Sequence, residues 1–411
     1  MAVLADARAP VVASVLAYRA GTRDERPGEE GAAHFLEHMM FKGSARFGPG
    51  EVDLETRALG GANNAYTNHD TTSYHFAFAA DRWTRGLDLE ADRMAGLRLD
   101  RREVDSERQV ILEEIALYEG DPWDALGEAV QARLFASHPY GRPVLGTRDS
   151  LAGIDGDGLD RFHRRHYRPS SGVLVIAGDV DPDRAHAAAA ERFASIAAGP
   201  PETPADPATD GRPPTSIERI TRHRGDVARL LLALPAPPLD HPDHPRLRLL
   251  TSVLGMGRSS RLHRHLVDRG QVTVWTSTDV HETIEPGMLM VATEILPGVE
   301  PTTVESMILE QLTRLADEPP SDAELERARR GLLADWLFAH ERVEPRADLI
   351  ATTLIHHDLS QPTEYLDRLA TADRDAIAAA ADRWLRADRG AVIGWSLPVD
   401  DPRDATDSHG D

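Results

Sequence analysis

The order of apolar and polar positions predicts strands in the first half of the chain. Pro10–Ala20 is rich in β-branched residues, which is typical of a strand. Thr71–Phe78 alternates apolar and polar residues, which predicts a strand with one buried face. Ser171–Val180 is an apolar run that leads into a turn, and it predicts a buried strand.

Helical spacing occurs between these strands. Apolar residues three and four positions apart predict helices over Gly31–Phe41, Arg82–Leu97 and Arg101–Glu119. We expect the last of these helices to stop at Gly120-Asp121-Pro122, because glycine and proline end a helix.

The second half of the chain repeats this mixture. Strands are predicted at Arg229–Pro235, Met288–Thr293 and Gly390–Ser396, and helices at His244–Leu254 and Ala323–Phe338. Each half closes with a helix end, a short turn and a buried strand. The repetition indicates a faint internal duplication.

A proline-rich segment separates the halves. Gly199–Thr215 holds paired prolines and almost no large apolar residue, which predicts a linker. The 411 residues then divide into a first domain over 1–198 and a second over 216–398, each of ordinary size. The small, acidic residues 399–411 predict a frayed tail.

Composition restricts the partners. The formal net charge of −22 argues against nucleic acid, because phosphate binding needs clustered positive charge. An acidic chain attracts basic peptides, or its charge only keeps it in solution, and both interpretations stay open. No apolar run approaches membrane-spanning length and no signal-peptide pattern is visible, so we expect a cytoplasmic protein without membrane contact.

Composition also restricts the chemistry. The chain has no cysteine, which excludes disulfides, thiolate catalysis and cysteine-held metals. Any metal must therefore be held by histidine, aspartate or glutamate. Lys42 is the only lysine beside many arginines, a skew that indicates genomic base composition rather than function.

Candidate chemistry begins in the predicted helix Gly31–Phe41. His34 and His38 are four residues apart and share a helix face, so they offer two imidazoles to one point, as tetrahedral zinc requires. Glu37 lies beside that face, where a carboxylate can take a proton from water at a metal. Two histidines at this spacing also occur as ordinary surface residues, so the motif alone does not decide.

A third ligand is expected from the second of the two long helices. Glu107 and Glu114 are seven residues apart and share one face, whereas Glu113 points about 100° away from Glu114, toward solvent. Glu114 stands near Val110 and Ile115, and a carboxylate on an apolar face is costly unless it is paired or bound to metal. A buried ion pair with an arginine is the alternative.

Several stretches resemble the M16 family of zinc peptidases, which carry an inverted zinc motif. They are GAAHFLEHMMFKGS, LGGANNAYTNHDTTSYHF, ERQVILEEIALYEGDP and HPYGRPVLGTRDSL. The spacing 114 − 38 = 76 is that of the family. The similarity covers nearly all of the first half and is weaker in the second.

The resemblance implies a role for each candidate residue of the metal site. His34, His38 and Glu114 would be the ligands of one zinc ion per chain, and Glu37 would be the general base. Glu107 would be a nearby acidic group that orients ligands or water.

The resemblance also implies a substrate site and a fold. Asn64, Ala65, Tyr66 and Thr67 would lie on an edge strand that pairs with an extended peptide. The expected fold class is α+β, with two homologous domains that each hold a mostly antiparallel sheet with helices packed on one face. The implied activity is that of a zinc metalloendopeptidase on unfolded peptides.

The second half departs from the family pattern at two positions. Many members carry an arginine and, seven residues later, a tyrosine, which donate to the substrate carbonyl. Here SSRLHRHLVDRGQVTVW places Val267 at the first position and Val274 at or next to the second. We therefore expect the zinc-bearing subunit of a heterodimer whose zinc-less homologue supplies both donors. A self-sufficient homodimer and a non-catalytic scaffold subunit are the alternatives, and the intact Glu37 speaks against the scaffold.

Overall fold

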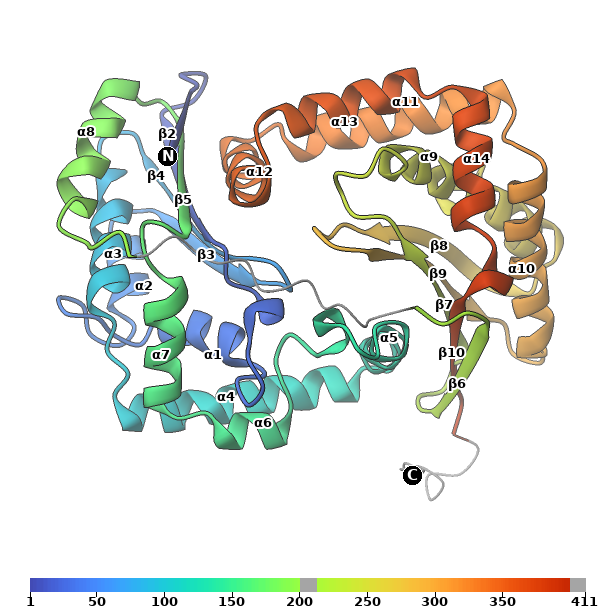
Figure 1. Ribbon diagram of the computed structural model, residues 1–411, viewed down its shortest axis with the longest axis horizontal. Helices are drawn as coiled ribbons and strands as arrows, with labels where there is room; N and C mark the ends of the chain where they lie inside the picture. The colour runs from blue at the N-terminus through green and yellow to red at the C-terminus, as the bar shows by residue number, and fades with distance from the viewer. Residues whose placement is uncertain (200–212, 400–411) are drawn as a thin grey trace. The chain divides into compact units, whose positions relative to one another are not determined.

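The computed structural model describes residues 1–199 and 213–399, which form two compact units (Figure 1). The first unit comprises the described residues of Met1–Ala116, Arg142–Pro207 and Leu337–Gln361. The second comprises those of Leu117–Gly141, Ala208–Trp336 and Pro362–Asp411. Neither unit is continuous in sequence, because each includes a segment from the other half of the chain.

Each unit contains one five-stranded sheet. The first has the order β1-β5-β2-β4-β3, with β1 Ala2–Ala5, β2 Val11–Tyr18, β3 Ala62–Thr67, β4 Thr72–Ala79 and β5 Gly172–Gly178. The second has the order β6-β10-β7-β9-β8, with β6 Ile217–His223, β7 Arg229–Ala236, β8 Thr273–His281, β9 Gly287–Ile295 and β10 Ala391–Leu397. In both sheets the first pair is parallel and the others are antiparallel, so the units share one topology.

Helices cover both sheets. Those of the first unit are η1 Thr22–Asp24, α1 Ala32–Met39, α2 Glu51–Ala58, α3 Thr84–Gly96, α6 Arg148–Gly153, α7 Gly156–His166, α8 Pro182–Phe193 and α12 Val343–His356. Those of the second are α5 Pro122–Leu134, η2 Pro139–Gly141, α9 His244–Gly255, η3 His263–Arg269, α10 Pro301–Asp317, α14 Arg374–Trp384 and η4 Ala387–Arg389. The unit boundaries fall inside α4 Arg101–Gly120, α11 Asp322–Ala339 and α13 Ser360–Thr371.

The predicted α+β fold class is confirmed. The predicted strands around Val12, Tyr74 and Val175 are present as β2, β4 and β5. Helix α4 ends at Gly120, as predicted, and Asp121 accepts hydrogen bonds from two backbone N–H groups at the start of α5. The predicted linker falls largely on 200–212 and the predicted tail on 400–411, both outside the described residues.

The main core of the first unit lies between one face of the sheet and helices that include α1, α3 and α7. The opposite face is covered by α12, which comes from the second half of the chain (Figure 1). Ala347 and Ala351 of α12 pack there against Ala17 and Ala177, where small side chains allow a close approach. In the second unit α5, from the first half, packs on β7 and β10. The two halves therefore exchange one helix each.

Helix α12 makes one expectation for β4 wrong. The alternating pattern predicted a strand with one buried face, yet Ser73 and His75 are buried as well as Tyr74 and Phe76. Both faces are buried because α12 lies over the polar one. A polar face covered by a distant helix cannot be told from a solvent-facing one by periodicity.

Polar contacts hold α12 in place. His75 Nε2 lies 3.3 Å from Asp348 Oδ1, and His75 Nδ1 lies 3.7 Å from Glu344 Oε1. The Tyr66 hydroxyl donates to Asp348 Oδ1 at 3.1 Å. Burial lowers the pKa of His75, but hydrogen bonds to the two carboxylates outweigh it and raise that pKa to about 9.

We expect the stability of the first unit to fall as pH rises toward 9. A histidine whose folded pKa exceeds its unfolded value of 6.5 stabilises the fold fully below pH 6.5, and the contribution is lost by about pH 9. The shift corresponds to about 3 kcal/mol for this largely buried side chain. The melting temperature of the protein, compared with that of His75→Gln between pH 6 and 10, measures it. A pH-independent difference between the two proteins would contradict the assignment.

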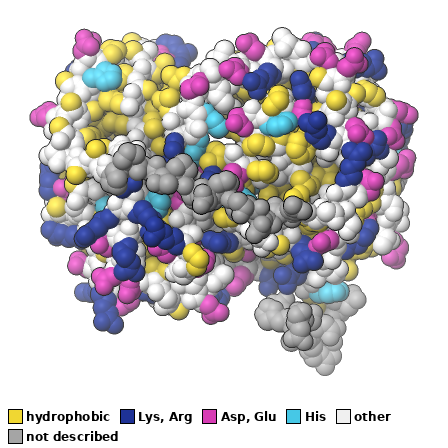
Figure 2. Space-filling view, viewed as in Figure 1, with side chains coloured by type: hydrophobic (Ala, Val, Ile, Leu, Met, Phe, Trp, Pro, Cys, Tyr) yellow, Lys and Arg dark blue, Asp and Glu magenta, His cyan; other side chains and the backbone are white. Residues whose placement is uncertain are grey.

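The surface carries both signs of charge. Figure 2 shows acidic and basic side chains interspersed over the visible face of both units. Within the described residues, no helix combines the length and apolar character that crossing a bilayer requires.

Candidate metal centre

The start of α1 is fixed by backbone geometry. Gly31 precedes it with φ 94°, and a Cβ atom there would lie 2.8 Å from the Leu145 carbonyl oxygen, so only glycine fits. The buried Glu25 carboxylate accepts from the backbone N–H groups of Gly31 at 3.0 Å and Ala33 at 2.9 Å. These bonds satisfy two donors at the helix start and set the position of His34 one residue later.

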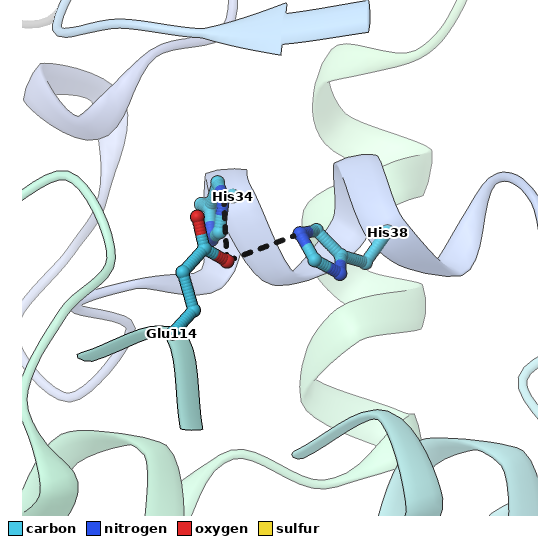
Figure 3. Close-up of side chains that lie close together, drawn as sticks. All are labelled: His34, His38 and Glu114. Carbon is cyan, nitrogen blue, oxygen red and sulfur yellow. Dashed lines mark ion pairs between the residues drawn. The ribbon is translucent and has the colours of Figure 1, made fainter. Parts of the chain in front are cut away.

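Two histidines and one glutamate meet beside α1. His34 and His38 lie on α1 and Glu114 on α4, and Figure 3 shows both rings directed toward one carboxylate oxygen. His34 Nε2 lies 3.8 Å from Glu114 Oε2, and His38 Nε2 lies 3.6 Å from the same atom. One donor atom from each residue lies within 4.8 Å of the other two. Among residues 1–199 and 213–399, no other group of three such side chains comes so close.

The donor set fits zinc. Two imidazole nitrogens and one carboxylate oxygen are the ligands of many catalytic zinc sites. Burial, followed by the charge of His38, lowers the pKa of His34 to about 3, so its ring stays neutral and keeps a lone pair for a metal. The His34 side chain is only 10% exposed.

His38 is oriented from behind by a second carboxylate. Its Nδ1 lies 2.8 Å from Glu107 Oε1, a contact that turns Nε2 toward Glu114. Burial lowers the pKa of His38, but the hydrogen bond and charge of Glu107 outweigh burial, and the pKa is raised. Metal binding at this ring therefore competes with protonation.

Glu107 is itself paired with Lys42. Lys42 Nζ lies 2.6 Å from Glu107 Oε2, so the carboxylate joins the single lysine of the chain to His38. Burial raises the pKa of Glu107, but the bonds from His38 and Lys42 outweigh it and lower that pKa. Sequence reasoning missed Lys42, although its being the only lysine among so many arginines was a usable signal.

Glu37 lies beside the three candidate ligands. Its Oε2 accepts a hydrogen bond of 2.6 Å from the Thr67 hydroxyl at the end of β3. Burial raises the pKa of Glu37, and the bond from Thr67 opposes that shift. A half-buried carboxylate with a raised pKa suits a group that accepts and returns a proton near neutral pH.

The structure brings together most of the predicted site. His34, His38, Glu114, Glu107 and Glu37 gather at one place, and Thr67 joins them. Within the described residues β3 pairs only with β4, so residues 64–67 lie on an edge strand of the sheet. Their pairing with a peptide stays a prediction.

The structure adds one detail to the prediction and corrects another. Tyr66 faces α12 on the opposite side of the sheet, where its hydroxyl meets Asp348. On α4, Glu107 is the buried carboxylate, whereas Val110 is 45% exposed and the Glu114 side chain 31% exposed. Ile111 and Ile115 lie on the buried side of α4. The expectation that Val110 lies on this side too is wrong, because neighbouring residues of one helical turn point in different directions.

The second unit lacks the two donors at the expected positions. Val267 lies in η3, and Val274 lies on the edge strand β8 with 52% of its surface exposed. Neither side chain can donate a hydrogen bond.

A two-domain α+β fold with His-x-x-Glu-His on one helix and a glutamate on another defines the class of proteins with an inverted zinc motif. Residues 1–148 match the family described as insulinase (peptidase family M16), and residues 153–332 match the peptidase M16 inactive domain. The chain belongs to peptidase family M16.

Similar proteins support this membership. An uncharacterised zinc protease of Mycobacterium leprae is 33% identical over 318 residues, which cover 76% of this chain and 70% of that protein. The zinc protease PqqE of Helicobacter pylori is 27% identical over 354 residues, or 85% and 79% of the two chains.

The fold is also shared with solved structures. A protease from Helicobacter pylori has a TM-score of 0.90 at 23% identity, covering 96% of this chain and 97% of that one. A peptidase M16 inactive domain from Pseudomonas fluorescens has a TM-score of 0.86 at 19% identity, covering 97% and 95%.

Proposed function

We propose that the protein is a zinc metalloendopeptidase that holds one zinc ion through His34, His38 and Glu114. The convergence of these three side chains beside Glu37, in a chain whose relatives are named zinc proteases, carries the proposal. A non-catalytic scaffold would need neither a carboxylate beside the ligands nor a bond that holds it.

Each residue of the site has a chemical task. When bound, zinc would polarise the scissile carbonyl and acidify water. Glu37 takes the proton from the attacking water and delivers it to the leaving amine. Glu107 keeps His38 turned toward the ligand position, and Lys42 balances the charge of Glu107.

The substrates we infer are unfolded peptides. The open edge of β3 allows an extended chain to pair with Asn64, Ala65, Tyr66 and Thr67 through its backbone. Such pairing requires an extended, unpaired segment in the substrate, and a folded protein seldom exposes one. The net charge of −22 favours basic peptides through long-range attraction, although the mixed surface in Figure 2 keeps this preference weak.

We further propose that this chain is the catalytic subunit of a heterodimer. Residues 1–198 would form the zinc-binding domain, and 216–398 a second domain without the arginine and tyrosine donors. Val267 and Val274, together with the inactive-domain match of residues 153–332, support this division. A zinc-less homologue would supply both donors. We place the protein and this partner in the cytoplasm.

Peptide hydrolysis by the purified, zinc-loaded chain tests the proposal. We expect slow or undetectable cleavage by the chain alone and efficient cleavage after addition of a homologous subunit that carries the arginine and tyrosine. Efficient cleavage by the pure chain would instead establish a self-sufficient enzyme, as in a homodimer. Absence of cleavage in every combination, with zinc bound, would contradict the peptidase assignment.

A further inference from the structure

We propose that Thr67 is a positioning residue that fixes Glu37 relative to the strand that receives the substrate. The inference rests on the proposed peptidase function and goes beyond it, because it gives the Thr67 side chain a task distinct from substrate pairing. Its basis is the 2.6 Å hydrogen bond from Thr67 Oγ1 to Glu37 Oε2.

The direction of the Thr67 side chain follows from strand alternation. Consecutive residues of β3 point to opposite faces of the sheet. Tyr66 points to the α12 face, where its hydroxyl donates to Asp348, and Thr67 therefore points to the α1 face. The last two residues of β3 are thus held from both sides of the sheet.

The Thr67 hydroxyl donates its proton to Glu37 and not to the neighbouring Thr72. Thr67 pairs with Thr72 across the β3–β4 hairpin, and their hydroxyl oxygens lie 3.3 Å apart. The Thr72 hydroxyl donates its proton to the Ala20 carbonyl oxygen at 2.7 Å. Thr72 therefore has no proton to offer Thr67, and the Thr67 proton goes to Glu37.

The consequence for Glu37 is that one carboxylate oxygen is fixed. Oε2 accepts from Thr67, and within the described residues Oε1 has no hydrogen-bond partner, so Oε1 is available for the proton of the attacking water. A flexible glutamate gains a single orientation from a bond to a rigid strand. Because β3 also offers its edge to the peptide, Glu37 and the scissile bond are placed on one common element.

Three variants separate positioning from a structural or substrate-binding role. Thr67→Val keeps the branched shape and removes the hydroxyl, and Thr67→Ser keeps the hydroxyl. Thr56→Val is the matched control, because the buried Thr56 hydroxyl donates to the Val52 carbonyl oxygen in α2, away from the site.

We expect Thr67→Val to lower kcat for peptide hydrolysis about tenfold, the usual size for one hydrogen bond to a charged group. KM and bound zinc should stay within about twofold, and Thr67→Ser should restore most of kcat. The assay uses the form of the protein that cleaves peptides, alone or with a partner subunit. An unchanged kcat in Thr67→Val, or a change confined to KM, would overturn the inference.

A second measurement does not depend on activity. In the metal-free protein, we expect Thr67→Val to lower the melting temperature by about 2 °C, and to have no effect in a Glu37→Ala background, where the acceptor is absent. Equal shifts in both backgrounds would overturn the inference even if no variant cleaved peptides. Coupling without cleavage by any variant would support the bond and count only against the peptidase function.

Discussion

Glu37→Gln is expected to lower kcat for peptide hydrolysis by at least about a hundredfold, while zinc stays bound. A general base contributes about 10² to 10⁴ in rate, and the amide of glutamine cannot accept the proton. The amide keeps the shape of the side chain and can still accept the hydrogen bond from Thr67, so the helix and its histidines are preserved. Steady-state kinetics and zinc content on the same sample give both readings.

Glu113→Gln is the matched control for this substitution. Glu113 is exposed on α4, next to Glu114, so the same change of charge occurs near the site without touching it. We expect its kcat to equal that of the unaltered protein. Retention of more than a tenth of kcat by Glu37→Gln would show that another group accepts the proton.

Glu114→Gln should weaken zinc binding itself, by more than about a hundredfold in dissociation constant. Loss of a group that only orients a ligand lowers metal affinity about 10- to 100-fold, and loss of a direct ligand lowers it more. The substitution removes the negative charge from the oxygen that lies within 3.8 Å of both histidine Nε2 atoms. Competition with a chelator of known affinity at fixed pH measures the change.

The two substitutions give opposite signatures, which makes them informative together. Glu37→Gln should lose rate and keep metal, whereas Glu114→Gln should lose metal and recover part of its rate at high zinc concentration. Unchanged zinc affinity in Glu114→Gln would mean that the third ligand lies elsewhere. Glu113→Gln again serves as the control for a carboxylate on the same helix.

The sequence was most informative where residues act through local geometry. The four-residue spacing of His34 and His38 places both on one face of α1, whatever surrounds the helix. The stop at Gly120 is likewise local, and it agrees with the prediction. Fold class, family and the two histidines therefore followed from the chain itself.

Which glutamate of α4 faces the histidines depends on packing. Glu107 and Glu114 share one face in the sequence pattern, yet Glu107 lies against Nδ1 of His38 and Glu114 lies near Nε2. Family resemblance separated their roles, and periodicity could not. The pairing of Lys42 with Glu107 is of the same kind, since side chains 65 positions apart meet only after folding.

The exchange of helices between the halves was decided by tertiary structure alone. The sequence by itself determined two similar α/β halves, a metal-type motif and the missing donors at Val267 and Val274. The sequence did not determine that α12 would cover the first sheet. The small apolar residues of α12 pack against Ala17, and a carboxylate of α12 pairs with His75, but these residues are far from α12 in the sequence. Local periodicity reports whether a face is apolar, and only the fold decides which segment covers it.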